Sequence, residues 1–231
     1  MQFSNTASNY NDRNITHENT FITTVKETKF LGLNINNTLS WTTHIDKIIP
    51  KLCSACFAVR SVRPFVSQQM LRMIYISYFH SIMSYGIIFW GQSSYSLRVF
   101  RLQKRIIRIM PGSGSAVSCR SLFINLKILP HPSLYIFSLL RFVIKNEDLF
   151  STNIDIHKIQ TRHCHDLHIR PTNSSKYQTA VFYMCIKPYN SLPSYIKAES
   201  NNIMKFLSIV KNFLSENTYS LEEFYNVCKS K

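Results

Sequence analysis

The chain has 231 residues, is 45% hydrophobic and 13% aromatic, and contains only five glycines. This composition excludes a disordered tail and favours packed helices over a turn-rich all-β fold. Twenty-seven Lys and Arg against twelve Asp and Glu give a net charge of +15, which indicates a polyanionic partner, either nucleic acid or an acidic membrane surface.

The N-terminal region predicts little regular structure at first and then two short strands. Residues 1–20 are rich in Asn, Thr and Ser, which is typical of a loop. Phe21–Val25 and Lys29–Ile35 alternate apolar and polar residues, the period-2 pattern of strands. Asn36-Asn37 is then predicted to turn the chain.

The next hundred residues predict helices. Ser40 is expected to cap the first helix, which runs to about Val59, and Pro50 inside it is expected to kink or split it. Caps, Pro and Gly positions delimit four more helices, at 67–86, 96–110, from about 118, and 132–145.

The composition changes after Asn146. Residues 154–175 are polar, His-rich and aperiodic, and we interpret them as a loop or linker with a boundary near residue 150. An apolar segment at 179–192, an amphipathic helix over 203–214 and a final helical turn around Phe224 follow. The predicted fold class is mainly α: a helical bundle preceded by a short β-hairpin.

The charge is concentrated between Lys47 and Asn146, where fourteen Lys and Arg occur without a single Asp or Glu. Within it, Arg98, Arg101, Arg105 and Arg108 have spacings of three, four and three, so they line one face of the predicted 96–110 helix with Lys104 beside them. The like charges on such a face repel one another unless an anion lies across it, and the phosphates of a nucleic acid would neutralise them. A helix that only faces water, and a partner protein's carboxylates, are the alternatives.

Three other kinds of site have weaker support. Cys53 and Cys56 form a CxxC, and His163-Cys164-His165 with His168 could complete a zinc site, but two cysteines in an amphipathic helix are more often core residues. The acids are too sparse for a two-metal hydrolytic centre, and no phosphate-binding Gly-rich loop follows a strand.

The segment Met73–Trp90 carries no formal charge over eighteen residues and is the one membrane candidate. Its serines, tyrosines and His80 make it too polar for a typical span, so we predict a buried helix and no membrane partner. The six cysteines are scattered and the N-terminus lacks a signal-peptide profile, so we expect reduced thiols in an intracellular protein.

Several motifs follow one another in a fixed order between roughly residues 25 and 215. They are Lys29-Phe30-Leu31-Gly32-Leu33 with Trp41 and His44-Ile45, Ala55-Cys56-Phe57-Ala58-Val59-Arg60, Ser84-Tyr85-Gly86-Ile87-Ile88-Phe89-Trp90-Gly91, Leu102-Gln103-Lys104-Arg105-Ile106-Ile107-Arg108-Ile109, Cys119-Arg120-Ser121-Leu122-Phe123, Ile128-Leu129-Pro130, Pro132-Ser133-Leu134-Tyr135-Ile136, Thr161-Arg162, Asp166-Leu167, and Ile186-Lys187-Pro188-Tyr189-Asn190-Ser191-Leu192-Pro193. Together these motifs resemble the region after the catalytic palm of non-LTR retrotransposon reverse transcriptases of the jockey-like group.

The resemblance implies three regions. Residues 1–39 would be an end-of-palm hairpin remnant with Phe30, Leu31 and Gly32 as a primer-grip-like turn, 40–150 a basic helical thumb-like domain, and 151–231 a C-terminal region with a polar linker and helices. The expected nucleic-acid contacts are Arg98, Arg101, Lys104, Arg105 and Arg108, with Arg60, Arg63, Arg120 and Lys29 as secondary candidates.

The family's polymerase needs an Asp-Asp strand that holds magnesium, and this sequence contains no Asp-Asp. The expected function is therefore non-catalytic and cofactor-free: binding of RNA or an RNA–DNA template–primer, in the nucleus or the cytoplasm. The alternatives are an inert decayed remnant, a membrane-associated basic protein using Met73–Trp90, and an interaction module that docks onto the remainder of a reverse transcriptase.

Overall fold

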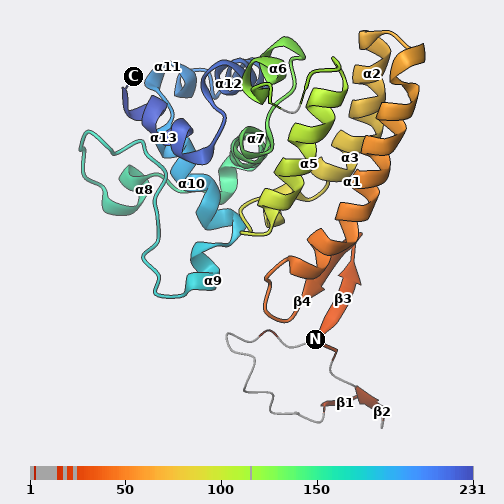
Figure 1. The fold of residues 1–231 in the computed structure, drawn as a ribbon. Coiled ribbons are helices and arrows are strands. Elements are labelled where there is room, and N and C mark those ends of the chain that lie inside the picture. The colour runs from red at the N-terminus through yellow and green to blue at the C-terminus, as the bar shows by residue number, and fades with distance from the viewer. Residues whose placement is uncertain (1–2, 4–14, 18–19, 23–24, 115, 231) are drawn as a thin grey trace.

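The computed structural model describes residues 3, 15–17, 20–22, 25–114 and 116–230. These residues form a mainly α-helical fold in which two antiparallel hairpins precede the helices (Figure 1), so the predicted fold class is confirmed. The strands are β1 (Ile15–His17), β2 (Thr20–Ile22), β3 (Glu27–Phe30) and β4 (Leu33–Asn36). The predicted strand at 21–25 overlaps β2, and residues 23–24 lie outside the described part of the chain.

The second hairpin corrects the predicted strand at 29–35. Phe30 pairs with Leu33, so Leu31 and Gly32 form a two-residue turn with φ values of +45° and +80°. Two consecutive positive φ angles match the twist of a hairpin. Leu is rarely found in the left-handed region, which is why the alternating pattern alone suggested one uninterrupted strand.

The first long helix, α1 (Thr42–Val62), starts and continues differently from the prediction. Trp41, with φ of +62°, occupies the N-cap without a side-chain bond, while Ser40 exchanges hydrogen bonds with Asn36 instead of capping. Pro50 does not split the helix. It lies on the exposed side, where the loss of one backbone hydrogen bond is least costly because water can replace it.

The helix predicted over 67–86 is divided among several short elements. Ser67 caps α2, accepting from the Met70 N–H at 3.3 Å as predicted, and Gly86 (φ +61°) lies between α3 and α4. The elements that follow α1 are the 3₁₀ turn η1 (Arg63–Phe65), α2 (Gln68–Ile74), the π-helical η2 (Tyr75–His80), α3 (Ser81–Ser84) and α4 (Ile87–Trp90). None of the helices in the described ranges has both the length and the apolarity to cross a bilayer.

The three helices predicted next are confirmed. They are α5 (Ser96–Ile109), α6 (Cys119–Asn125), capped by Ser118, and α7 (His131–Lys145), with Pro132 in its first turn. Gly112 follows α5 with φ of +77°.

The C-terminal elements include more helix than the sequence suggested. Within the predicted linker, α8 begins with a capping box between Thr152, its N-cap, and Asp155. The elements are η3 (Glu147–Leu149), α8 (Asn153–His157), α9 (Ser175–Gln178), α10 (Val181–Ser191), α11 (Ser194–Lys197), α12 (Ile203–Asn217) and α13 (Leu221–Ser230).

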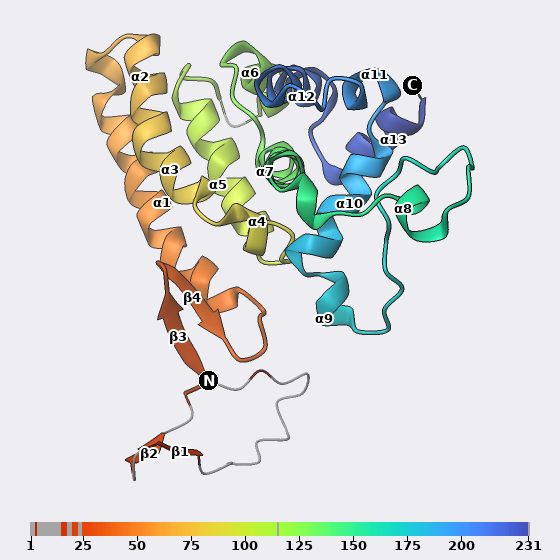
Figure 2. The same cartoon turned by 180° about the vertical axis from the view of Figure 1, so that it is seen from behind.

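Helices from both ends of the chain share one hydrophobic core around α7. Helices α10, α12 and α13 pack on α7, while α1 packs along α5, as Figures 1 and 2 show. The buried Gln103 of α5 holds this centre together. Its amide donates to the Tyr75 hydroxyl at 3.0 Å and the Leu129 carbonyl at 2.9 Å, and its oxygen accepts from the His131 backbone N–H at 2.7 Å.

Candidate nucleic-acid interface

The basic residues of α5 lie on its outer face, as their spacing predicts. The opposite face carries Val99, Gln103, Ile106 and Ile107, which are fully buried. Because buried residues occupy one side of the helix, the cations must share the other, where Arg98, Arg101 and Arg105 are exposed and Lys104 and Arg108 are half-buried.

Three of these five cations already have a partner within the protein. Arg98 forms a 2.5 Å ion pair with Asp46 of α1, and Arg108 donates to the Val117 carbonyl at 3.0 Å. The Lys104 ammonium lies 4.8 Å from the centre of the Phe100 ring. In the part of the chain that the structure describes, Arg101 and Arg105 make no ion pair.

Helix α1 adds Arg60 to the same surface. Burial raises the pKa of the Cys56 thiol to about 11, and the charges of Arg105 and Arg60 oppose that rise. The Cys56 thiol lies 4.0 Å from the Leu102 carbonyl of α5, and Arg60 follows Cys56 by one turn of α1. We define the basic face as Arg60, Arg98, Arg101, Lys104, Arg105 and Arg108.

Arg63, which directly follows α1, contacts the residues that follow α5. A Cβ added to Gly112 would lie 1.7 Å from Arg63 Nη2, so the guanidinium packs directly on the glycine that follows α5. Arg63 thus borders the basic face, and Gly112 is needed both for its positive φ and for this close approach.

Arg120 of α6, a secondary candidate, is held by an acid. Its two terminal nitrogens bond the Glu223 carboxylate at 3.1 and 2.9 Å, and its guanidinium carbon lies 5.9 Å from the Tyr219 ring centre. This bidentate pair neutralises Arg120 and links α6 to α13.

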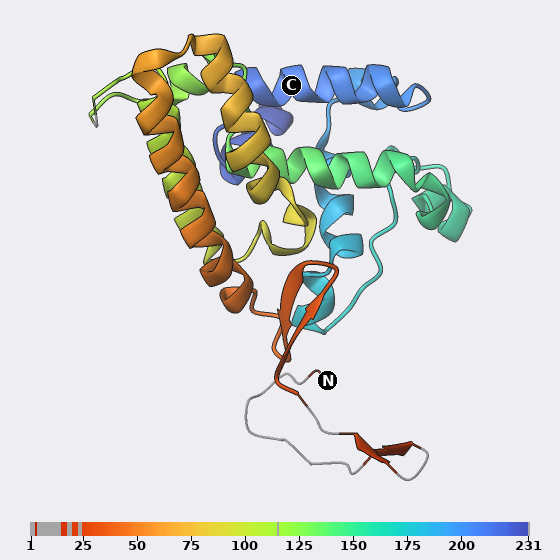
Figure 3. The same ribbon diagram turned by 90° about the vertical axis from the view of Figure 1, so that its right-hand side faces the viewer.

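Lys29 lies elsewhere, in a groove that sequence reasoning missed. The groove has a volume of about 730 Å³ and runs between the β3–β4 hairpin, α1 and α3; Figure 3 shows the hairpin beside the N-terminal end of α1. We call it the hairpin groove. Its lining residues are Lys29, Gly32, Asn34, His44, Lys47, Ile48, Lys51, Ser81, Ile82 and Tyr85.

The primer-grip-like turn forms one edge of this groove. The Tyr85 hydroxyl donates to the Leu31 carbonyl, and a Cβ on Gly32 would lie 3.2 Å from the Tyr85 ring. Phe30 and Leu31 are exposed, with 61% and 74% of their surface accessible. Gly32 therefore lets an aromatic ring seat directly on the turn.

The residues considered for zinc do not gather. Cys53 is exposed on α1, Cys56 is buried, and His163 and His168 lie near α8. Among the described residues, no three His, Cys, Asp or Glu side chains come together in a way that could hold a metal ion.

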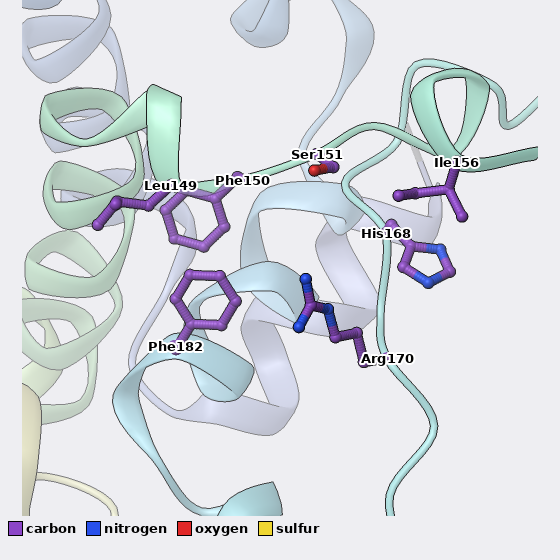
Figure 4. Close-up of a pocket in the computed structure, with 7 residues that line it drawn as sticks. All are labelled: Leu149, Phe150, Ser151, Ile156, His168, Arg170 and Phe182. Atoms are coloured by element: carbon purple, nitrogen blue, oxygen red, sulfur yellow. The ribbon is translucent and has the colours of Figure 1, made fainter.

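A further small cavity lies in the C-terminal region beside the stacked rings of Phe150 and Phe182, whose centres are 4.6 Å apart (Figure 4). Its volume of about 20 Å³ is enough for one water molecule and too small for a substrate.

Comparisons with protein-family models, with curated proteins and with solved structures find no match to this chain.

Proposed function

We propose that the chain binds template–primer nucleic acid non-specifically through the basic face, as the thumb-like part of a non-LTR retrotransposon reverse transcriptase of the jockey-like group. The observation that carries this proposal is the set of exposed guanidinium groups of Arg60, Arg101 and Arg105, none of which forms an ion pair within the described residues.

The electrostatics of this surface favour a phosphate backbone as the ligand. The only acid paired with the basic face in the described structure is Asp46, at one end of α1. Cations held on rigid helices without counter-charges keep mobile anions around them, and a polyanion that replaces those anions gains their release entropy. Arg guanidinium groups also match phosphate oxygens in geometry.

The proposed role is non-catalytic, because the sequence lacks the Asp-Asp pair that the family's polymerase uses to hold magnesium. Polymerisation would belong to the remainder of such an enzyme, with this chain holding the duplex. The order and number of the motifs shared with the jockey-like group support this assignment.

The test is binding of a labelled RNA–DNA primer duplex to the wild type and to the triple variant Arg60→Gln, Arg101→Gln, Arg105→Gln. Each substitution removes one exposed charge that forms no ion pair within the described residues, so the fold should persist. We expect the affinity to fall about 100-fold at physiological salt, as the loss of three phosphate contacts implies.

A matched control is the variant Arg141→Gln, Lys145→Gln, Lys211→Gln, which removes the same charge from exposed positions on α7 and α12. It should lose less than about threefold, because these cations act only through the screened long-range field. Equal losses in the two variants, or no binding by the wild type, would contradict the proposal and favour an inert remnant.

A further inference from the structure

Three lysines converge on the hairpin groove from two elements. Lys29 comes from β3, and Lys47 and Lys51 are one turn apart on α1. All three are exposed, and the Lys47 ammonium is held by the Asn34 amide oxygen at 2.8 Å. No Asp or Glu belongs to the lining.

The groove and the basic face lie on different sides of α1. Asp46 turns toward α5, where it pairs with Arg98, and Arg60 lies one turn beyond Cys56, whose thiol contacts the Leu102 carbonyl of α5. Lys47 and Lys51 are offset from Asp46 by about 100° and 140° around the helix, and they face the hairpin. One straight duplex lying on the basic face therefore leaves the groove open.

The positive charges in the groove affect the pKa of the buried His44. Burial lowers the pKa of His44, and the charges of Lys51 and Lys47 lower it further. The His44 Nδ1 accepts the Asn34 backbone N–H at 3.4 Å, which suits a neutral ring. The nearest hairpin acid, Glu27, accepts a bond from Thr43 at 2.9 Å.

An aromatic ring completes the lining. Tyr85 is 54% exposed, and its hydroxyl bond to Leu31 fixes the ring over Gly32. A fixed, accessible ring beside converging ammonium groups is the combination that binds single-stranded nucleic acid, since a base stacks on the ring while phosphates meet the cations.

We propose that the hairpin groove is a second nucleic-acid site, which holds a single-stranded segment through Lys29, Lys47 and Lys51 with a base stacked on Tyr85. This deepens the proposed function, because it gives the chain a strand-binding groove separate from the duplex-binding basic face.

The test is binding of fluorescein-labelled oligothymidylate of about ten residues to the intact chain and to two triple variants. Lys29→Gln, Lys47→Gln, Lys51→Gln should weaken oligothymidylate binding at least about tenfold and change duplex affinity less than about threefold. The basic-face variant, Arg60→Gln, Arg101→Gln, Arg105→Gln, should show the reverse. Equal effects of both variants on the oligonucleotide would overturn the assignment.

The stacking contact has its own readout. Photo-cross-linking of an oligonucleotide that contains 4-thiouridine, followed by peptide mapping, should label Tyr85, and Tyr85→Phe should keep binding while Tyr85→Leu weakens it. Cross-links confined to α5 would overturn the proposal. A mononucleotide, thymidine monophosphate, or a polyglutamate peptide that binds as tightly as the oligonucleotide would also overturn it.

The two proposals fail in different ways. If the groove binds oligothymidylate but the chain does not bind the duplex, the proposed function fails and the groove assignment stands. If duplex binding depends on the basic face but oligothymidylate binding does not depend on the three lysines, only the groove assignment fails.

Discussion

The region from Lys47 to Asn146 and the region from Glu147 to Lys231 use their cations differently. The first has fourteen Lys and Arg without an acid, and the second has ten Lys and Arg with eight Asp and Glu. In the described C-terminal part, Lys197 pairs with Asp166 and Lys205 with Glu199, both within 2.9 Å. Among the residues that the structure describes, the two ion pairs of the basic region are formed with acids outside it, Asp46 and Glu223.

The difference teaches that cation number is a poor guide to a polyanion site. Cations with nearby carboxylates are used for packing, whereas cations on an acid-free helix face keep their charge available. Both regions nevertheless share one hydrophobic core, so they differ in the charge of their surfaces and not in a separation of their interiors.

The largest expected effect tests that shared core. Gln103→Leu would leave the Tyr75 hydroxyl, the Leu129 carbonyl and the His131 N–H without their partner. We expect the free energy of unfolding to fall by about 3 to 6 kcal/mol, since each buried unpaired group costs about 1–3 kcal/mol. Urea unfolding followed by circular dichroism measures it.

In that experiment Gln69→Leu, on the exposed side of α2, is the control and should change stability by less than about 0.5 kcal/mol. Two separate unfolding transitions in the wild type would contradict a core that joins both regions.

A second prediction concerns pH and His131, which starts α7 inside the core. Burial lowers its pKa to about 4, and its Nε2 has no hydrogen-bond partner in the described structure. Because the unfolded pKa is about 6.5, the unfolded state binds more protons between these values. The contribution of neutral His131 to the free energy of unfolding is therefore fully present above pH about 6.5, and it decreases as the pH falls toward 4.

The His131→Leu variant should remove about 3 kcal/mol of this acid sensitivity between pH about 7 and 4. His44 and His80, whose pKa values burial also lowers, are present in both proteins, so the difference isolates His131. Parallel stability curves for the two proteins would show that His131 is not the responsible group.

A third prediction separates packing cations from binding cations. Lys197 donates to Asp166 at 2.9 Å and to the Asn190 carbonyl at 2.7 Å, and about a quarter of its side chain is exposed. Lys197→Met should lower stability by about 1–2 kcal/mol and leave duplex affinity within about twofold of the wild type. A loss of affinity as large as that of Arg101→Gln would erase the distinction between the regions.

The fourth and smallest expected effect tests whether a cation that is released from its acid becomes available for binding. Glu223→Gln frees Arg120 beside the basic face at a stability cost of about 0–1 kcal/mol, since the pair is partly exposed to solvent, which screens it. Duplex affinity, measured by fluorescence anisotropy, should rise about threefold to tenfold because one more cation becomes available. An unchanged affinity would place Arg120 outside the nucleic-acid path.

Local signals predicted much of this fold. Ser67 and Ser118 cap helices as expected because an N-cap depends on a side chain and the next three residues. The turn at Leu31 was missed because its carbonyl is held by the Tyr85 hydroxyl, 54 positions away in the sequence. The unbroken helix at Pro50 was missed because the local pattern does not show that Pro50 lies on the exposed side of α1.

The candidate site also combines features that the local sequence predicts with features that depend on contacts between distant residues. The spacing of the α5 arginines predicted a shared face, since helical periodicity fixes it. The pairing of Arg120 with Glu223 joins residues 103 positions apart, and the hairpin groove forms only when β3 and β4 fold beside α1. The four-residue spacing of Lys47 and Lys51 was the one available signal for that groove.

The most direct test of the central claim is the salt dependence of duplex binding, measured from about 50 to 200 mM salt. The account predicts a linear fall of log affinity with log salt, with a slope that is shallower by about 2 to 3 in Arg60→Gln, Arg101→Gln, Arg105→Gln. The control Arg141→Gln, Lys145→Gln, Lys211→Gln should keep the wild-type slope. A basic-face variant with an unchanged slope would contradict the account.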